Sequence, residues 1–319
     1  MAFRHIVVAG GGVLGAQIAF QTAFKGFDVT VWLRSEGSIG RTEPKLERLY
    51  NVYRAEIARV EAALKAGEPL DLPRGFGAAD SVKSEADIQR LYEAVDTAKK
   101  KLKLSLDLEQ CANEADFIIE SMAEDREAKR GFYAKLAPYL DDKTIVATNS
   151  STMIPSMFSD LLPYPENYLS LHFANNIWRS NTAEVMGHSG TSKEAFGAVL
   201  AFAAEIGMIP LELHKEQPGY ILNSMLVPFL SSAEALWANE VADPETIDKT
   251  WKLGTGSPLG PFQILDIVGL TTAYNVVAMN PESQNPESTP GKIAAGLKAK
   301  IDEGKTGINA GEGFYRYEK

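Results

Sequence analysis

A chain of 319 residues, with 45% hydrophobic and 23% charged residues, has enough apolar material for one or two globular domains, which argues against bulk disorder. The net charge of −10 argues against a nucleic-acid partner held by general electrostatics. Cys111 is the single cysteine, so the chain has no intrachain disulfide and no thiol-based metal site, and we expect no bound metal.

The first residues bear on location. We expect no apolar run long enough to span a bilayer, and the chain opens with a strand pattern at residues 5–9, so we expect no presequence. We therefore expect no membrane partner and, by default, a cytoplasmic protein.

The elements that follow alternate between strand and helix. IVVAG, the helical spacing from Val13 to Phe24, and FDVTVWL predict one βαβ unit, which requires a parallel sheet. Two long amphipathic patterns come next, over residues 46–64 and 88–102, separated by the loop GEPLDLPRGFG. This arrangement predicts a helical hairpin inserted in the sheet.

The strand pattern then resumes with ADFIIES, KTIVATN, YLSLHF and GMIPLEL, interleaved with helical segments at about 125–139 and 192–206. Beyond residue 219 the spacing is helical and no convincing strand follows. The sequence therefore predicts an α/β protein. Residues 1–214 form an N-terminal Rossmann-type doubly wound sheet that carries the hairpin, and residues 215–319 form an all-helical C-terminal domain.

A glycine-rich turn follows the first strand and opens the first helix. GGGVLG fits G-x-G-x-x-G, in which the first glycine permits the tight turn and the second lets a pyrophosphate approach backbone amides. The third glycine allows the helix to pack closely on the strand. The motif predicts a dinucleotide site built from Gly10, Gly12, Val13, Leu14 and Gly15.

The end of the second strand bears on which dinucleotide is bound. An Asp or Glu there would hydrogen-bond the adenosine ribose of NAD. The strand ends at Leu33 instead, and Arg34 and Ser35 follow. A guanidinium pairs with a 2′-phosphate and a serine hydroxyl donates to it, so the sequence favours NADP. Alternatively, Arg34 is a solvated loop residue and Glu36 contacts the ribose, which would favour NAD.

Histidine is the usual proton-transfer residue near neutral pH, and the chain has 4. His172 differs from the others because YLSLHFANN places it at the carboxyl end of a strand, where open α/β sheets bind ligands. TAEVMGH brings Glu184 close enough, as a hairpin partner, to hold the imidazole tautomer. Residues 149–152, Asn-Ser-Ser-Thr, follow another strand end, where their hydroxyls either face the same crevice or cap a helix.

With these residues in place, the chain resembles the 3-hydroxyacyl-CoA dehydrogenase family, and in particular its 3-hydroxybutyryl-CoA dehydrogenases. The resemblance rests on motifs that occur in the family's order: GGGVLGAQIA, FIIESMAED, ATNSST, LHFANN, AEVMGH, QPGYILNSMLVP, GTGSPLGPFQILDIVGL and GKTGINAGEGFYRY. It implies an oxidoreductase that moves a hydride between the C3 hydroxyl of a short-chain 3-hydroxyacyl-CoA and a nicotinamide cofactor.

The resemblance also implies roles for single residues. His172 matches the general base at the 3-hydroxyl, and Glu184 matches the carboxylate that orients it. Ser151 and Asn223 match polar residues on the substrate side of the catalytic group, and Asn175 matches the asparagine after the catalytic histidine.

Two further residues, Glu124 and Lys129, match residues that line the nicotinamide side of the cofactor. In the family the helical domain closes over the cleft and forms most of a dimer interface. The resemblance therefore implies a homodimer with a small-molecule substrate.

The chain departs from the family beside the histidine. Residues 172–176 read His-Phe-Ala-Asn-Asn where family members typically read His-Phe-Phe-Asn-Pro, and Trp178 and Arg179 follow. If these side chains face the cleft, Arg179 could hold a carboxylate and Trp178 could pack on a cation or a flat group. The inserted hairpin is mixed in charge instead of lysine-rich, although a CoA substrate carries several phosphates.

Three functions are therefore considered. The first is a 3-hydroxyacyl-CoA dehydrogenase. The second is a dehydrogenase of a small free hydroxy acid, similar to carnitine and gulonate dehydrogenases. The third is a non-enzymatic dinucleotide-binding or crystallin-like structural protein, and the joint presence of His172, Glu184, Ser151 and Asn223 argues against it.

Overall fold

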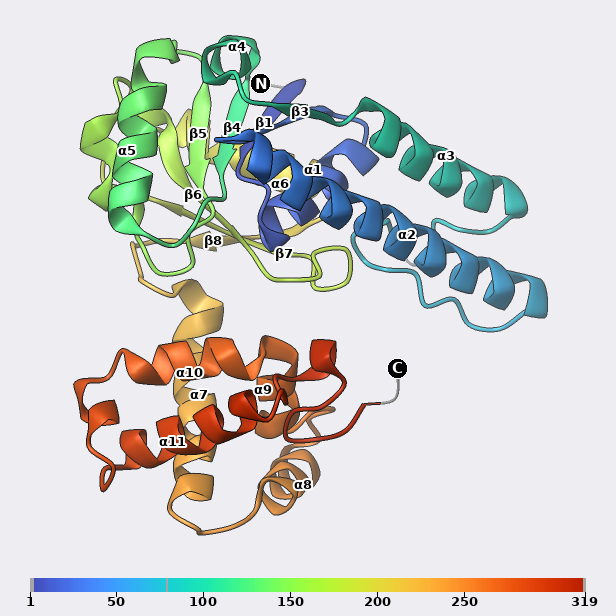
Figure 1. The fold of residues 1–319 in the computed structure, drawn as a ribbon. Helices are drawn as coiled ribbons and strands as arrows, with labels where there is room; N and C mark the ends of the chain where they lie inside the picture. Colours follow the sequence, from blue (N-terminus) through green and yellow to red (C-terminus); the bar gives the residue numbers. More distant parts are fainter. Residues whose placement is uncertain (1–2, 79, 318–319) are drawn as a thin grey trace. The chain divides into compact units, whose positions relative to one another are not determined.

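The computed structural model describes residues 3–78 and 80–317, and the chain divides into two compact units (Figure 1). The first unit ends at Ile221 and the second begins at Leu222. This division falls just inside a helix that starts at Tyr220, a few residues beyond the expected boundary at 214/215.

The first unit is built on an eight-stranded sheet with the strand order β3-β2-β1-β4-β5-β6-β7-β8. The first six strands pair in parallel, and β7 pairs antiparallel to β6 and parallel to β8. The strands are β1 (His5–Ala9), β2 (Asp28–Trp32), β3 (Lys103–Ser105), β4 (Phe117–Glu120), β5 (Ile145–Thr148), β6 (Tyr168–Phe173), β7 (Thr182–Gly187) and β8 (Ile209–Leu213). The short β3 was not predicted from the sequence.

Helices cover both faces of this sheet, which confirms the predicted doubly wound architecture (Figure 1). Because side chains alternate along a strand, Ile6 and Val8 of β1 face one core while Val7 and Ala9 face the other. The first core contains residues of α1 (Val13–Phe24) and α6 (Lys193–Glu205), and the second contains residues of α4 (Leu108–Glu114) and α5 (Arg126–Leu136).

The predicted helical hairpin is present as α2 (Glu36–Ala66) and α3 (Glu85–Lys101). Its apolar stripe, including Tyr53 and Ile57, packs on the same core as α1. Three residues separate the end of β2 from the start of α2, and Gly67, with a left-handed φ of 69°, caps the C-terminal end of α2.

A buried glutamine fastens the base of this hairpin to the sheet domain. The Gln21 side-chain amide donates to the carbonyl oxygens of Gly75 at 2.8 Å and Ile206 at 2.7 Å. Its carbonyl oxygen accepts a hydrogen bond from the Tyr53 hydroxyl at 2.6 Å. Because each of these polar atoms is buried, the contacts fix α1, α2, the hairpin loop and the end of α6 to one another.

The second unit is helical throughout its regular elements, as predicted. Its core gathers Leu230, Phe262, Leu265, Leu270 and Leu297. The helices are α7 (Tyr220–Ala238), α8 (Pro244–Thr255), α9 (Pro261–Val268), α10 (Leu270–Ala278) and α11 (Thr289–Asp302). Single 3₁₀ turns lie at Ala137–Tyr139, Pro155–Met157, Ser159–Leu161, Pro165–Asn167, Pro281–Gln284 and Ile308–Ala310.

One expectation about α7 is wrong. Its 19 residues, with a mean hydropathy of 1.2, are long and apolar enough to cross a membrane by length and composition alone. The prediction that the chain contains no apolar run of this length is therefore wrong. A single such helix is weak evidence for a membrane span, because the core helix of a globular unit passes the same test.

Candidate active site

The glycine turn between β1 and α1 has the shape that a dinucleotide requires. A Cβ on Gly10, where φ is +118°, would lie 2.4 Å from the backbone oxygen of Ser121. A Cβ on Gly15 would lie 2.1 Å from the backbone oxygen of Gly10, so the close packing of α1 on the turn depends on this glycine. A Cβ on Gly12 would meet nothing within 4 Å. The open space lies at the start of α1, where backbone amides can receive a pyrophosphate.

Two further residues of the motif sit at the same helix start. Val13 and Leu14 are the first residues of α1, and the Val13 side chain is 64% exposed. The five predicted residues therefore lie together, and they fit a bound dinucleotide.

The start of α2 lies beside this turn and carries the residues expected to meet the adenosine. Arg34 and Ser35 are exposed, and Ser35 is the N-cap residue of α2. The Ser35 and Ser38 hydroxyls are 3.0 Å apart, and the Arg41 guanidinium donates to the Ser38 hydroxyl at 3.0 Å. The hydroxyl of Thr42, the residue after Arg41, donates to the backbone oxygen of Gly11 at 3.2 Å.

Arg41 was not predicted, because its place depends on where α2 begins. The helical pattern was visible only from residue 46, whereas α2 begins at Glu36. With that start, residues 35, 38 and 41 fall on one side of the first turns of α2. A cation next to two hydroxyls is the arrangement expected of an anion site.

His172 and Glu184 form the predicted pair. They are direct partners in the antiparallel β6–β7 ladder, and Nδ1 of His172 lies 2.9 Å from Oε2 of Glu184. Nε2 of His172 lies 3.2 Å from the Ser151 hydroxyl, and both members of the pair are buried. Glu184 thus holds one ring nitrogen, and the other faces a hydroxyl on the loop after β5.

Two residues at the start of α7 complete this pair and were not predicted. The Tyr220 ring stacks on the His172 ring with centroids 4.4 Å apart and an interplanar angle of 15°. The backbone N–H of Ile221 donates to Oε1 of Glu184 at 2.9 Å. No sequence pattern indicates either contact, because the turn that places them depends on a left-handed backbone at Tyr220.

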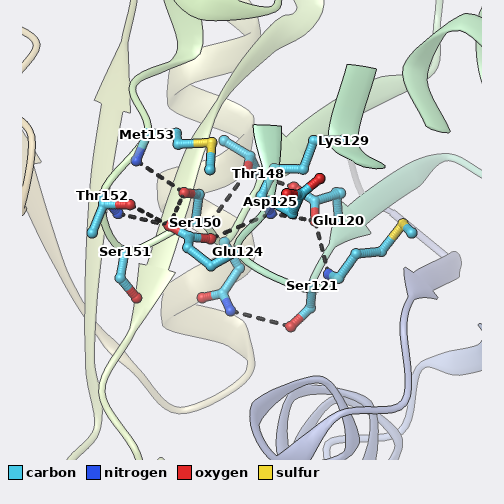
Figure 2. A network of polar contacts seen from close by, with 12 residues as sticks. Glu120, Ser121, Glu124, Asp125, Lys129, Thr148, Ser150, Ser151, Thr152 and Met153 are labelled. Carbon is cyan, nitrogen blue, oxygen red and sulfur yellow. Dashed lines mark hydrogen bonds and ion pairs between the residues drawn. The ribbon is translucent and has the colours of Figure 1, made fainter. Parts of the chain in front are cut away.

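Figure 2 shows a polar network on the other side of Ser151. Oε1 of Glu124 accepts hydrogen bonds from the Ser150 hydroxyl and from both the backbone N–H and the hydroxyl of Thr152. Burial disfavours the charged form of Glu124, but the hydrogen bonds from Ser150 and Thr152, together with Lys129, outweigh it and lower the pKa of the carboxyl. Glu124 therefore fixes the loop on both sides of Ser151.

Beneath this loop lies a fully buried ion pair between Glu120, at the end of β4, and Lys129 of α5 (Figure 2). Lys129 Nζ is 2.7 Å from Oε1 of Glu120 and 3.5 Å from Oε2 of Glu124. Glu120 also accepts hydrogen bonds from the Thr148 and Tyr133 hydroxyls and from the Met122 amide. Glu120 was not predicted as a site residue, although its place at a strand end matches that of His172.

The structure corrects the interpretation of Trp178 and Arg179. Trp178 is only 8% exposed and packs in the core against Tyr53, so its indole does not face an open cleft. The Arg179 guanidinium donates to both carboxylate oxygens of Glu56, at 2.7 and 2.8 Å, and to Asp71 at 3.1 Å. These two carboxylates of the hairpin region account for Arg179 without a substrate.

Two asparagines complete the predicted set. Asn175 is exposed in the loop that follows β6. Asn223 lies in α7, within the helical unit. Their roles at the substrate stay predictions.

A doubly wound sheet with a dinucleotide turn and a buried histidine–carboxylate pair, both at the carboxyl edge, defines a nicotinamide-dependent oxidoreductase. The family description "3-hydroxyacyl-CoA dehydrogenase, NAD binding domain" matches residues 5–217, and "3-hydroxyacyl-CoA dehydrogenase, C-terminal domain" matches residues 219–317. The chain belongs to the 3-hydroxyacyl-CoA dehydrogenase family.

Individual relatives agree with this assignment. The chain is 28% identical over 318 residues to the mitochondrial hydroxyacyl-coenzyme A dehydrogenase of Homo sapiens, covering 99% of this chain and 91% of the relative. It is 43% identical to a diketoreductase of known structure, with a TM-score of 0.83 and coverage of 99% and 100%. The (S)-3-hydroxybutyryl-CoA dehydrogenase of Ralstonia eutropha shares the fold, with 23% identity, a TM-score of 0.70 and coverage of 100% of both chains. These comparisons do not favour the hydroxy-acid dehydrogenase or the structural-protein alternative.

Proposed function

We propose that this protein interconverts a short-chain 3-hydroxyacyl-CoA and its 3-oxo form, with His172 as the proton-transfer residue. The observation that carries the proposal is the His172 imidazole, held at Nδ1 by Glu184 and facing Ser151 through Nε2. Parallel strands β1, β5 and β6 end at the same edge of the sheet, so the glycine turn, Ser151 and His172 lie along that edge, where open α/β sheets bind their ligands.

The chain's own groups define the proton transfer. In the oxidative direction, Nε2 of His172 accepts the proton of the 3-hydroxyl, and Glu184 stabilises the imidazolium that forms. The Ser151 hydroxyl lies 3.2 Å from Nε2, so an oxygen bound at Nε2 is also within hydrogen-bond reach of Ser151. Ser151 donates a hydrogen bond to this reacting oxygen. The nicotinamide, when bound, supplies the acceptor of the hydride from C3.

We propose further that NADP(H) is preferred over NAD(H). Arg34, Ser35 and Arg41 place two guanidinium groups and a hydroxyl at the start of α2, next to the glycine turn. This donor set suits a 2′-phosphate, and the ribose-binding acid at the end of β2 is replaced by Leu33. Glu36, in the first turn of α2, is the residue that would instead serve NAD.

Substitution of Arg34 tests the cofactor preference. Arg34→Asp should lower kcat/KM for NADPH about tenfold or more relative to that for NADH, because one charge-assisted contact is lost and a repulsion is gained. Arg48→Asp, at an exposed position of α2, makes the same change in net charge and should leave the ratio unchanged. An unchanged ratio in the Arg34 variant would contradict the phosphate site.

Initial rates of acetoacetyl-CoA reduction, with NADH and NADPH at equal concentration, test the reaction itself. We expect turnover with both cofactors and faster turnover with NADPH. Absence of turnover from protein that binds a nicotinamide cofactor would reject the acyl-CoA assignment.

A second candidate substrate is a dicarbonyl compound without CoA. Two observations favour it: the 43% identity to a diketoreductase that catalyses reactions of dicarbonyl compounds, and the charges of the hairpin. Two of the basic side chains there are paired between its helices, Arg54 with Asp96 and Lys99 with Glu47. The ratio of kcat/KM for acetoacetyl-CoA to that for ethyl acetoacetate separates the two, because only the first carries a CoA moiety.

We also propose a homodimer in the cytoplasm. α7 exposes a run of apolar side chains, among them Leu222 and the 63% exposed Met225, and a second copy would cover them. Light scattering on the purified protein should give a dimer, and Met225→Glu should shift it towards a monomer. Cell fractionation tests the location, and recovery of the protein in the membrane fraction would contradict it.

A further inference from the structure

We infer that Tyr220 and the Ile221 amide are positioning groups for the His172–Glu184 pair. This inference rests on the proposed function, since it concerns the orientation of the proposed proton-transfer residue. Both groups belong to one short turn at the start of α7, within the first compact unit. They act on different members of the pair, one through a ring face and one through a hydrogen bond.

The stacking contact supplies a restraint that hydrogen bonds cannot. His172 is held in its ring plane by Glu184 at Nδ1 and by Ser151 at Nε2, and these contacts leave the ring free to tilt about the line that joins them. A parallel ring 4.4 Å away blocks that tilt on one face. Tyr220 is itself fully buried against Met186 and Leu213, so it is a fixed surface.

The backbone at this turn is in a conformation that an aromatic residue rarely adopts. Gly219 has a φ of +82° and Tyr220 a φ of +55°, in the left-handed region that disfavours bulky side chains. Such outliers persist where surrounding contacts over-determine them, and they cluster at functional sites. Here the left-handed turn directs the ring to His172 and the next N–H to Glu184.

The Ile221 amide fixes the carboxylate. N–H groups in the first turn of a helix lack partners within the helix, and this one donates to Oε1 of Glu184 while Oε2 contacts His172. Both oxygens are then engaged, so the carboxylate cannot swing away from the imidazole. The start of α7 therefore orients both members of the pair.

Two substitutions separate stacking from the hydroxyl group. Tyr220→Leu removes the ring face, and we expect kcat for acetoacetyl-CoA reduction to fall about tenfold or more, with KM changed less than about threefold. Tyr220→Phe keeps the ring face and should retain kcat within about threefold. Tyr53→Leu is the matched control: it removes an equally buried tyrosine of the same unit that has no contact with His172, and it should retain kcat.

A second readout does not depend on activity. In protein labelled with ¹³C-histidine, the ring protons of His172 should be shifted upfield by the stacked ring, with His172→Ala identifying the signal. Tyr220→Leu should abolish this shift and Tyr220→Phe should keep it. If Tyr220→Leu does not fold, Tyr220→Met replaces it in both experiments.

The outcomes distinguish this inference from the proposed function. If the unsubstituted protein does not turn over acetoacetyl-CoA, the proposed function fails, and the histidine spectra still decide the positioning role. If that protein is active and Tyr220→Leu retains its kcat, or Tyr220→Phe loses as much as Tyr220→Leu, the positioning role of the ring is wrong.

Discussion

The two units each bury a glutamate, and their surroundings are opposite. Glu120 in the first unit is 0% exposed and receives four donors, including the Lys129 ammonium. Glu234 in the helical unit is 3% exposed, and its Oε1 has no hydrogen-bond partner among the described residues. Burial raises the pKa of the Glu234 carboxyl from 4.5 to about 7.

The difference shows that the surroundings of a buried carboxyl group decide whether it is held as a charged or as a neutral group. Around Glu120, every donor comes from an element that ends at the ligand edge of the sheet or packs beside it, so the charge organises the site. Around Glu234, an apolar core favours the neutral acid. Because its pKa is raised on folding, Glu234 contributes stability that is present below pH 4.5 and is lost as the pH rises through about 7.

The largest expected effect concerns proton transfer by His172, which lies in the same unit as Glu120. His172→Ala should lower kcat about 10²- to 10⁴-fold, because proton transfer is lost, while leaving cofactor affinity nearly unchanged. His188→Ala is the control, since His188 contacts the Pro165 carbonyl in a surface loop of the same unit. Steady-state rates and cofactor titration measure both, and normal turnover in the His172 variant would remove the assigned role.

Breaking the buried ion pair tests whether Glu120 and Glu234 differ in energy as well as in contacts. Glu120→Leu leaves Lys129 buried without its main partner and should lower the free energy of unfolding by about 3–5 kcal/mol. The double substitution Glu120→Leu/Lys129→Met should recover part of this loss. Denaturant titration measures the effect, and a single variant as stable as the original would show that the pair is dispensable.

Glu234→Gln tests the other side of the comparison. The original protein should lose on the order of 3 kcal/mol of unfolding free energy between pH 4.5 and pH 8 through this group, from the pKa of about 7. The glutamine variant should lack that component, so its stability at pH 8 should exceed that of the original protein. Unfolding followed at several pH values decides it, and parallel pH profiles would contradict the raised pKa.

The smallest expected effect lies at the opposite end of the helix that starts at Tyr220. Glu240 is exposed and has a left-handed φ of +57°, like Tyr220, but contacts no part of the proposed site. Glu240→Gly should raise the free energy of unfolding by about 0.5–1 kcal/mol without changing kcat. A loss of stability would show that the left-handed backbone at this position costs nothing.

Local patterns were enough to predict much of this molecule. The strand β1, the glycine turn and α1 were predicted because their signals are contiguous in sequence. The contact between His172 and Glu184 was also predicted, because two adjacent antiparallel strands fix their register within a few residues. The family predicted from the sequence is confirmed by the family descriptions that match residues 5–217 and 219–317. The cofactor preference, the roles of the site residues and the dimer stay predictions.

The errors and omissions arise where distant segments meet. Trp178 and Arg179 follow β6 in sequence, yet the hairpin supplies the core and carboxylates that hold them. Tyr220 reaches His172 only through a left-handed turn, which no pattern of apolar spacing reveals. Glu120 and Lys129 are nine residues apart in sequence, on a strand and a helix, and their pairing is decided by how α5 packs on the sheet.

The hydrogen bonds of Gln21 have a consequence for engineering. Since this side chain joins α1 to Tyr53 of α2, to the loop carbonyl of Gly75 and to the end of α6, the hairpin is not a detachable module. A chimera that exchanges residues 36–101 between relatives would have to carry the matching partner in α1 as well. The hairpin is thus coupled to the helix that begins at the dinucleotide turn.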